Sequence, residues 1–392
     1  MTTPSKFGEW IESYRNGYGK RPGVGEAGPI VLRIADVSTG EIDLSTPRRG
    51  EISAKDAATY GLHNGDLLFV RVNGSRDIVG RCCVIRPDLP ADTIFNDHLI
   101  RARLKSGLDP EFAKYWLGLP HARQIIEKAA STSAGQLTIS QQVLDSIEIP
   151  DIHLDYQRTI AARIKTQLAS VEEARQATKA QLRELTHLAN AIIRETLAHP
   201  DTETQSLGEV LEEVKQGIGN RWAEFPVLGA TRDGLAPAKE PVGKKPERYK
   251  PVQVGTVFYN PMRILIGSIA MVDEGDAPGI TSPDYVALRG RTGLVDSRWF
   301  YYWLRSPEGE HCIASLARGA VRERMLFNRL AEGAIKLPPY PVQQTASQAL
   351  SELHPLRQSI EAQLHDIELL PSRLLARTFD SIEDTPDARP VN

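Results

Sequence analysis

Cysteine is scarce in this chain: only three occur in 392 residues, and two of them, Cys82 and Cys83, are adjacent. So few cysteines cannot supply a disulfide framework, so we expect a reduced, cytoplasmic protein. The chain also lacks any run of about 18 apolar residues, and we therefore expect no membrane-spanning helix. The N-terminal stretch MTTPSKFGEW has no basic segment followed by an apolar run, so a signal peptide is not expected.

An overall excess of positive charge is absent as well. The formal net charge is −3 and the sequence pI is near 6.3, which argues mildly against a nucleic-acid binder, because recognition domains of that class are usually basic. The distribution of charge weakens this objection. Nine Lys or Arg stand against four acids between residues 215 and 263, and four arginines stand against one glutamate between residues 316 and 329.

Motifs for catalysis and metal binding are also missing. The glycine-rich GYGKRPGVG (17–25) lacks the first glycine of a Walker A loop, since that position is Tyr14, and Arg21 replaces the Ser/Thr. The 259–262 segment YNPM lacks the second proline and the aromatic residue of the amino-methyltransferase tetrapeptide. The Glu-x-Lys at 213–215 has no Pro-Asp pair at a convincing distance before it, and the nine histidines have no metal-ligand spacing. We therefore expect no catalytic residue, no metal and no cofactor in this chain.

What the sequence does contain is an internal repeat. FGEWIESYRNGYGKR (7–21) returns as LGEVLEEVKQGIGNR (207–221) with six identities in fifteen positions, where composition alone would give about one. The segments 63–85 and 254–272 follow, and both read as two strands joined by a polar loop that contains an arginine. The aromatic-rich segments 108–126 and 294–313 are each predicted to be one amphipathic helix, followed by the polar loops 131–140 and 317–325. The repetition predicts two domains with one frame.

After each predicted domain the apolar residues change to helical spacing. An apolar stripe with few apolar residues beside it is typical of a coiled-coil seam, and such a helix cannot bury its seam alone. The predicted seam residues are Ile164, Leu168, Val171, Leu182, Leu185 and Ile192 in the first helix, and Leu350, Leu353, Ile360, Leu364, Ile367 and Leu374 in the second. The nearest partner for each helix is the other, and we expect them to pair antiparallel.

The predicted fold is therefore two duplicated α/β (α+β) domains separated by two long antiparallel coiled-coil helices, with the domains related by a pseudo-two-fold axis. The expected boundaries are 1–152 for the first domain, 153–200 for the first helix, 201–341 for the second domain and 342–380 for the second helix. A disordered tail is expected at 381–392.

Several of these segments resemble the specificity subunit of type I restriction–modification systems. They are GDLLFVRVNGSRDIVGRCCVI, STSAGQLTIS, IEIPDIHLDYQRTIAARI and LTHLANAIIRETL in the first half, and YNPMRILIGSIAMV, LPPYPVQQTASQAL and IELLPSRLLARTF in the second. Each motif is moderately specific, whereas their order and duplication are highly specific. The resemblance covers residues 7 to 379.

The resemblance implies a DNA-binding, non-catalytic subunit of a bacterial or archaeal phage-defence system. In that family each domain reads one half of a split target in double-stranded DNA, and the helices fix the spacing between the halves. Two methyltransferase subunits dock on the specificity subunit and bind S-adenosylmethionine, and restriction subunits that use ATP and Mg can join. These cofactors would lie on the partners.

Base reading requires side chains with bidentate hydrogen-bonding capacity, whereas phosphate contacts mainly position the protein. On this basis the predicted DNA-binding residues are Arg71, Asn73, Ser75, Arg76 and Gln136 in the first domain, and Arg232, Lys244, Lys245, Arg248, Tyr259, Asn260, Arg263, Arg322 and Arg324 in the second. Lys244, Lys245 and Arg248 are expected on phosphates. For Asn260 a purely structural role also stands, because Asn-Pro often starts a turn.

Three other classes of function stay open at this point. The chain could be a stand-alone DNA-binding adaptor or regulator with duplicated domains. It could be an interaction scaffold in which the coiled coil is the functional part and the basic loops are merely solvated. A degenerate enzyme is the third class.

Overall fold

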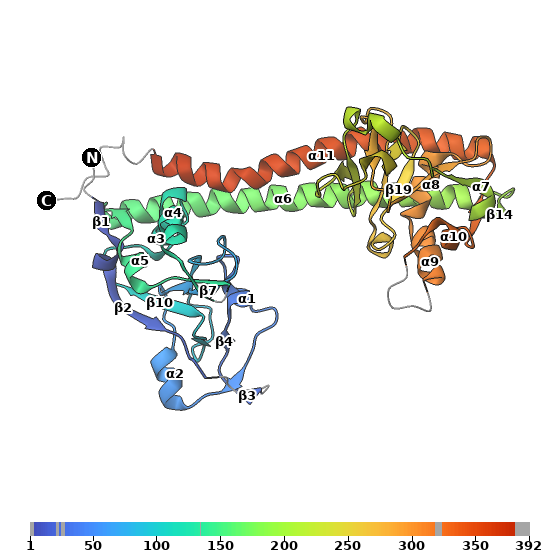
Figure 1. The fold of residues 1–392 in the computed structure, drawn as a ribbon. Coiled ribbons are helices and arrows are strands. Elements are labelled where there is room, and N and C mark those ends of the chain that lie inside the picture. The colour runs from blue at the N-terminus through green and yellow to red at the C-terminus, as the bar shows by residue number, and fades with distance from the viewer. Residues whose placement is uncertain (1–3, 21–22, 25–27, 134, 318–323, 381–392) are drawn as a thin grey trace. The chain divides into compact units, whose positions relative to one another are not determined.

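The computed structural model describes residues 4–20, 23–24, 28–133, 135–317 and 324–380 (Figure 1). The chain forms two compact units: the first combines residues up to 175 with those from 366 onward, and the second comprises residues 176–365. Each unit therefore contains one predicted domain and a part of each long helix, α6 (Leu154–Leu197) and α11 (Tyr340–Asp380). The predicted disordered tail, 381–392, lies outside the described residues.

The first unit is built on a four-stranded antiparallel sheet in the order β2 (Ile11–Asn16), β10 (Leu99–Leu104), β6 (Leu67–Val70) and β8 (Cys82–Val84). Strand β6 is buried on both faces, which explains why it reads LLFV without alternation: Leu67 and Phe69 belong to one apolar core, Leu68 and Val70 to another. The other elements are β1 (Pro4–Lys6), η1 (Phe7–Trp10), β3 (Gly23–Val24), β4 (Val31–Leu32), α1 (Ile34–Val37), β5 (Gly50–Glu51), α2 (Ala54–Tyr60), β7 (Val72–Asn73), β9 (Ile94–Phe95), α3 (Pro110–Leu117), α4 (Pro120–Ala129), β11 (Ser131–Ser133), β12 (Gln136–Thr138), α5 (Gln141–Asp145) and β13 (Glu148–Pro150).

The second unit repeats this plan with the sheet order β15 (Leu211–Glu213), β22 (Val286–Gly290), β19 (Val257–Tyr259) and β20 (Ile269–Met271). Strand β19 again faces two cores, with Val257 and Tyr259 on one side and Phe258 on the other. The remaining elements are β14 (Glu203–Ser206), α7 (Leu207–Val210), η2 (Gly219–Glu224), β16 (Leu228–Thr231), β17 (Gly234–Pro237), η3 (Pro246–Arg248), β18 (Lys250–Val252), η4 (Ile264–Ile266), β21 (Gly279–Thr281), α8 (Ser297–Leu304), α9 (Pro307–Leu316), α10 (Phe327–Leu330) and β23 (Ala334–Leu337). The duplicated frame is confirmed.

The two aromatic-rich segments were each expected to form one helix, and that expectation is wrong. Each forms two: α3 and α4 in the first unit, α8 and α9 in the second. Pro120 and Pro307 stand in the first turn of the second helix of each pair, where a proline is well tolerated. A proline disfavours helical geometry in the residue before it, so the preceding helix ends at Leu117 or Leu304.

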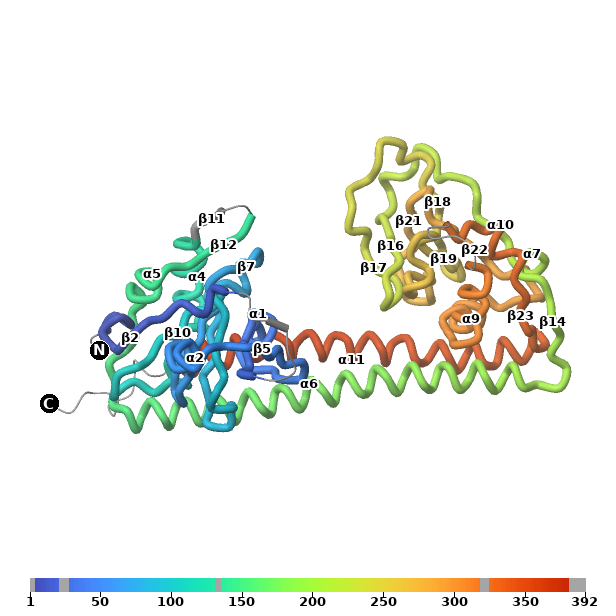
Figure 2. Tube along the Cα trace, turned by 90° about the horizontal axis from the view of Figure 1, so that it is seen from below, coloured from blue at the N-terminus to red at the C-terminus, as the bar shows by residue number. Residues whose placement is uncertain are grey.

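The long helices run antiparallel within each unit (Figures 1 and 2). In the first unit, Ile164 near the start of α6 shares a core with Phe379 near the end of α11. In the second unit, Ile193 near the end of α6 shares a core with Leu350 near the start of α11. All twelve predicted seam residues are buried or half-buried, but Ile164, Leu350 and Leu353 belong to the domain cores. How the two units lie relative to each other, and with it the pseudo-two-fold axis, stays a prediction.

A fully buried glutamine fastens the first turns of each long helix to its domain. Gln157 accepts a hydrogen bond from the Asp109 backbone N–H at 2.8 Å, and its amide donates to the carbonyls of Gly107 and Ile152 at 2.9 and 2.8 Å. In the second unit Gln343 does the same. It accepts from the Asp296 N–H at 3.0 Å and donates to the carbonyls of Leu294 and Pro338 at 3.0 and 2.8 Å. Asp109 and Asp296 also cap the helices α3 and α8.

The repeated glycines Gly17 and Gly217 permit close backbone packing. A Cβ at Gly17 would stand 2.0 Å from the carbonyl oxygen of Asn96, and one at Gly217 would stand 2.5 Å from that of Glu247. The sequence therefore needs glycine here for space, at the end of β2 and just after β15. Among the residues that the structure describes, no helix is long and apolar enough to cross a membrane.

Candidate nucleic-acid interface

The hairpins predicted to touch DNA share one local structure in both domains. Asn73 Oδ1 accepts a hydrogen bond from the Ser75 N–H at 2.8 Å, and Asn260 Oδ1 accepts one from the Met262 N–H at 2.9 Å. Seven residues after each asparagine, Gly80 and Gly267 take left-handed backbone angles with φ of 75° and 83°. Both asparagine side chains are thus engaged in shaping the turn, which favours the structural role for Asn260.

In the first domain two separate predicted loops come together. Strand β7, which contains Asn73, pairs with β12, which contains Gln136. Gln136 is exposed, whereas the Arg71 guanidinium donates to the carbonyl of Asp97 at 3.1 Å. Arg76 is exposed at the hairpin tip and has no hydrogen bond or ion pair from its side chain among the described residues. Its cation is therefore available to a ligand.

In the second domain the hairpin is joined to the segment that begins at residue 324. The Met325 N–H donates to the carbonyl of Pro261 at 3.1 Å, so Arg324 is held beside the loop. Arg263 and Arg324 are both exposed, and neither side chain has a hydrogen bond or ion pair in the described part of the chain. Arg322 lies outside the described residues.

Tyr259 is a correction to the predicted interface. Its side chain is fully buried in the core of the second domain, because position 259 is the last residue of β19 and faces inward. Burial, together with the nearby carboxylate of Glu213, raises the pKa of its phenol above the ordinary value. The aromatic ring therefore packs the core and cannot contact a ligand at the surface.

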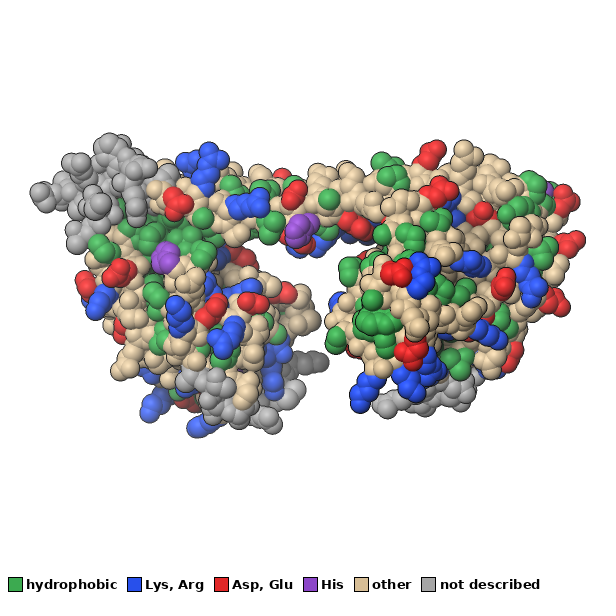
Figure 3. All heavy atoms as spheres, turned by 45° about the horizontal axis from the view of Figure 1, so that its top comes forward, with side chains coloured by type: hydrophobic (Ala, Val, Ile, Leu, Met, Phe, Trp, Pro, Cys, Tyr) green, Lys and Arg blue, Asp and Glu red, His purple; other side chains and the backbone are tan. Residues whose placement is uncertain are grey.

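The remaining predicted cations lie on the surface of the second domain. Lys244, Lys245 and Arg248 are exposed, and Arg232 is exposed in the turn between β16 and β17. On the face drawn in Figure 3, Lys and Arg side chains crowd the lower edge of this unit. The exposed cations give this domain a surface that attracts a polyanion.

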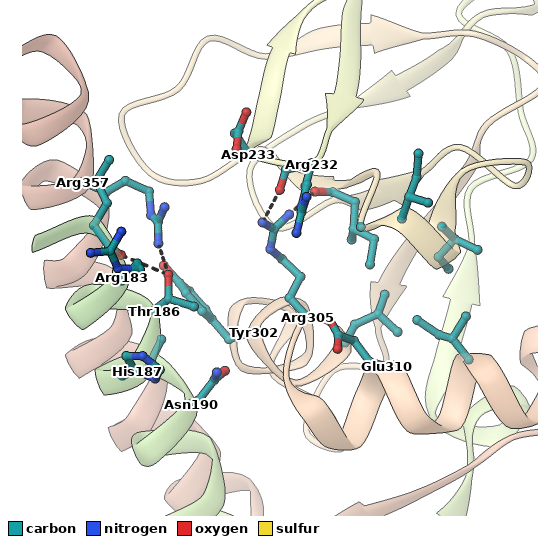
Figure 4. A pocket seen from close by; sticks show the side chains of 18 of the residues that line it. Arg183, Thr186, His187, Asn190, Arg232, Asp233, Tyr302, Arg305, Glu310 and Arg357 are labelled. Carbon is teal, nitrogen blue, oxygen red and sulfur yellow. Dashed lines mark hydrogen bonds between the residues drawn. The ribbon is translucent and has the colours of Figure 1, made fainter. Parts of the chain in front are cut away.

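A cleft of about 1020 Å³ opens within the second unit, between the domain and the long helices (Figure 4). Arg183, His187 and Asn190 line it from α6, facing Arg232 and Arg305 of the domain. The cleft is also lined by Thr186, Asp233, Tyr302, Glu310, Arg357 and Glu361. Arg357 donates to Thr186 Oγ1 at 3.0 Å and joins the two helices, while Arg305 donates to the carbonyls of Ile269 and Arg232 at 2.7 and 2.6 Å.

A cleft of about 760 Å³ occupies the corresponding place in the first unit. A shift of 187 positions relates many of the domain residues that line the two clefts, as in Gly80 and Gly267 or Tyr115 and Tyr302. The chemistry differs at equivalent places, since Arg123 of the first cleft corresponds to Glu310 of the second. The molecule thus carries two related but chemically distinct clefts.

Sequence reasoning missed both the clefts and the buried glutamines. A usable signal was present: Gln157 and Gln343 are the second residues of the similar stretches YQRT and VQQT, and domain residues that line the clefts recur at the shift that relates the hairpins. No group of three or more His, Cys, Asp or Glu side chains that could hold a metal ion occurs within the described ranges.

Comparisons with known proteins identify similar chains. No protein-family model matches. The EcoKI specificity subunit of Escherichia coli (strain K12), a type I restriction enzyme subunit, is 28% identical over 187 residues, covering 48% of this chain and 40% of that protein. The StySPI specificity subunit of Salmonella potsdam is 28% identical over 190 residues, covering 48% of this chain and 41% of that protein. The chain therefore spans about two fifths of these relatives' length.

Two further similarities extend over nearly the whole chain. The putative MjaX specificity subunit of Methanocaldococcus jannaschii is 24% identical, covering 93% of this chain and 89% of that protein. A chain from a structural study of assembly and conformational transition in a type I restriction–modification system superposes with a TM-score of 0.63 at 16% identity, covering 96% of this chain and 97% of that one. At that identity the superposition shows a shared fold.

Proposed function

We propose that this chain, which belongs to the family of type I restriction enzyme specificity subunits, reads a bipartite sequence in double-stranded DNA. The observation that carries the proposal is the repetition of one hairpin on two copies of one frame, with different side chains at the tips. Arg76 of the first hairpin and Arg263 of the second occupy equivalent places, and both cations are exposed. The tips differ at their neighbours, because Ser75 and Ile78 of the first hairpin stand where the second has Met262 and Leu265. A shared frame with different tips suits two readers of different half-sites.

Exposed arginines at a hairpin tip suit guanine, whose O6 and N7 accept a bidentate pair of hydrogen bonds in the major groove. Lys244, Lys245 and Arg248 suit the phosphates, which carry affinity rather than sequence information. We further propose that α6, which contributes to both units, sets with α11 the number of unread base pairs between the half-sites.

We propose that two methyltransferase subunits dock on this chain, one on each unit. Equivalent places related by the repeat suit two copies of one partner. The methyltransferase would supply S-adenosylmethionine, and restriction subunits that join the complex would supply ATP and Mg chemistry. This chain itself would be non-catalytic, acting in the cytoplasm of a bacterium or archaeon.

The test is methylome mapping of cells with and without this gene product. We expect one split methylation motif that disappears with the gene. Arg76→Ala should relax the preference at one position of one half-site, and Arg263→Ala should do so in the other half-site only. Arg291→Ala is the matched control, because Arg291 is exposed in the same domain as Arg263 but lies away from the hairpin.

Two results would contradict the proposal. An unchanged methylome in the absence of the gene, with no sequence-specific DNA binding by the purified complex, would remove the DNA-reading function. Sequence-specific binding without any methyltransferase partner would instead favour the stand-alone adaptor. A uniform loss of binding across all sequences in Arg263→Ala would make that residue a phosphate contact.

A further inference from the structure

The hairpin tip of the second domain exposes three large apolar side chains. Met262, Leu265 and Ile266 are 56%, 61% and 66% exposed, although they follow one another within five residues of a short turn. Exposed single apolar residues are common, but a contiguous exposed group marks an interaction site. Leu265 and Ile266 of this group also line the cleft of the second unit. We call these three residues the apolar tip.

The first domain does not share this feature. The residues at the equivalent positions are Ser75, Ile78 and Val79: the serine is polar, the isoleucine is half-buried and the valine is fully buried in the core. The frame of the hairpin is the same in both domains, so the frame does not require an exposed apolar tip. The exposed apolar tip is therefore specific to the second domain.

The surroundings of the apolar tip are cationic. Arg263 lies within the tip sequence, Arg324 lines a small hollow together with Met262 and Leu265, and the Arg232 stem approaches Gly267 at the end of the turn. Asp233 is the acid next to Arg232, and its exposed carboxylate makes no ion pair among the described residues. Apolar side chains rimmed by three arginines fit a polyanion with apolar groups on its surface.

Double-stranded DNA has this chemistry in its major groove. Each thymine presents a C5-methyl group there, flanked by acceptor atoms and bordered by phosphates. We infer that the apolar tip contacts thymine methyl groups in the half-site of the second domain, with the neighbouring arginines on base edges and phosphates. This inference rests on the proposed DNA-reading function and assigns a chemical class of base contact to one domain only.

The test removes the methyl group without changing base pairing. Once the half-sites are known, each thymine of the target duplex is replaced in turn by deoxyuridine, and the affinity of the purified complex with its methyltransferase is measured by fluorescence anisotropy. A buried methyl contributes about 0.8 kcal/mol, so we expect about a four-fold weaker affinity at one or two positions of the second half-site.

The variants Leu265→Ala and Ile266→Ala should lose this sensitivity to the methyl group. Val254→Ala is the matched control, since Val254 is 50% exposed in the same domain outside the tip. Replacement of thymines in the first half-site should leave the variants and the unmodified protein with identical responses. Because the tip side chains are exposed, the thermal stability of the variants should not change.

The inference fails if deoxyuridine has no effect anywhere in the second half-site, or if that half-site contains no A·T pair. It also fails if Leu265→Ala weakens the association with the methyltransferase while DNA affinity per assembled complex is unchanged, because the tip would then be a protein-docking surface. In each case sequence-specific binding would persist, so the proposed function would survive the failure. Loss of all sequence preference in the unmodified protein would instead refute the proposed function.

Discussion

Replacement of Gln343 by alanine should destabilise the second unit, because this side chain makes three hydrogen bonds in a fully buried position. The change leaves the Asp296 N–H and the carbonyls of Leu294 and Pro338 buried without their hydrogen-bond partner. A buried group left without its partner costs about 1–3 kcal/mol, and the alanine also leaves a cavity. We expect a loss of about 3–5 kcal/mol in the free energy of unfolding, with part of the cost relieved by local relaxation.

The assay is urea unfolding followed by tryptophan fluorescence. Trp299 reports on the affected region, since its indole N–H donates to Thr196 Oγ1 at 2.9 Å in the buried junction between α8 and α6. In thermal unfolding the same loss corresponds to about 10 °C for a unit of this size. Gln344→Ala is the matched control: the neighbouring glutamine is exposed, and its replacement should change stability by less than about 0.5 kcal/mol.

A second variant separates hydrogen bonding from volume. Gln343→Met keeps most of the side-chain volume but cannot bond the three backbone groups, so it should remain destabilised by more than about 2 kcal/mol. If Gln343→Met matches the unmodified protein, or if Gln343→Ala behaves like Gln344→Ala, the reasoning about the buried amide is wrong.

Two further predictions concern close packing and thiol reactivity. Gly17→Ala and Gly217→Ala should each lower the free energy of unfolding by more than about 3 kcal/mol, because the new Cβ would meet a backbone carbonyl. Gly19→Ala should be nearly neutral, because the nearest neighbour of its Cβ would be 3.8 Å away. Equal unfolding midpoints for Gly17→Ala and Gly19→Ala would contradict this prediction. Burial raises the pKa of the Cys82 and Cys83 thiols to about 12, so neither should react with iodoacetamide in the native protein at pH 8. Peptide mapping should show that half-buried Cys312 reacts first. Rapid modification of Cys82 or Cys83 in the folded protein would show that strand β8 is not buried as described.

Much of the architecture could be predicted because repetition and hydrophobic period are local signals. The hairpins at 63–85 and 254–272 follow from short apolar, strand-forming runs on both sides of a polar loop, and the structure pairs β6 with β8 and β19 with β20. The long helices follow from their apolar stripes. Pro355 and Pro371 disfavour helix locally, yet both lie within the continuous helix α11. The helical preference of the rest of the segment outweighs theirs.

What the sequence could not supply depends on long-range packing. Tyr259 stands beside a polar loop and reads as a surface residue, but the strand directs its ring into the core. Gln157 looks like any other polar residue of a solvated helix, yet it is buried by carbonyl and amide groups about fifty positions away in sequence. Ile164 reads as a coiled-coil residue, whereas the structure places it in a domain core. Burial decides each of these roles, and burial is set by partners that no local pattern reveals.

The first unit is assembled from two segments that lie on either side of the second unit in the sequence, and this has a consequence during protein synthesis. Phe379 packs edge-on against Phe112 and Trp116 with ring centroids 5.5 and 5.2 Å apart. The core of the first unit is therefore incomplete until residue 379 has been synthesised. The second unit is continuous from residue 176 to residue 365, so all of its contacts are available earlier. The domain that the ribosome makes first is the one that finishes folding last.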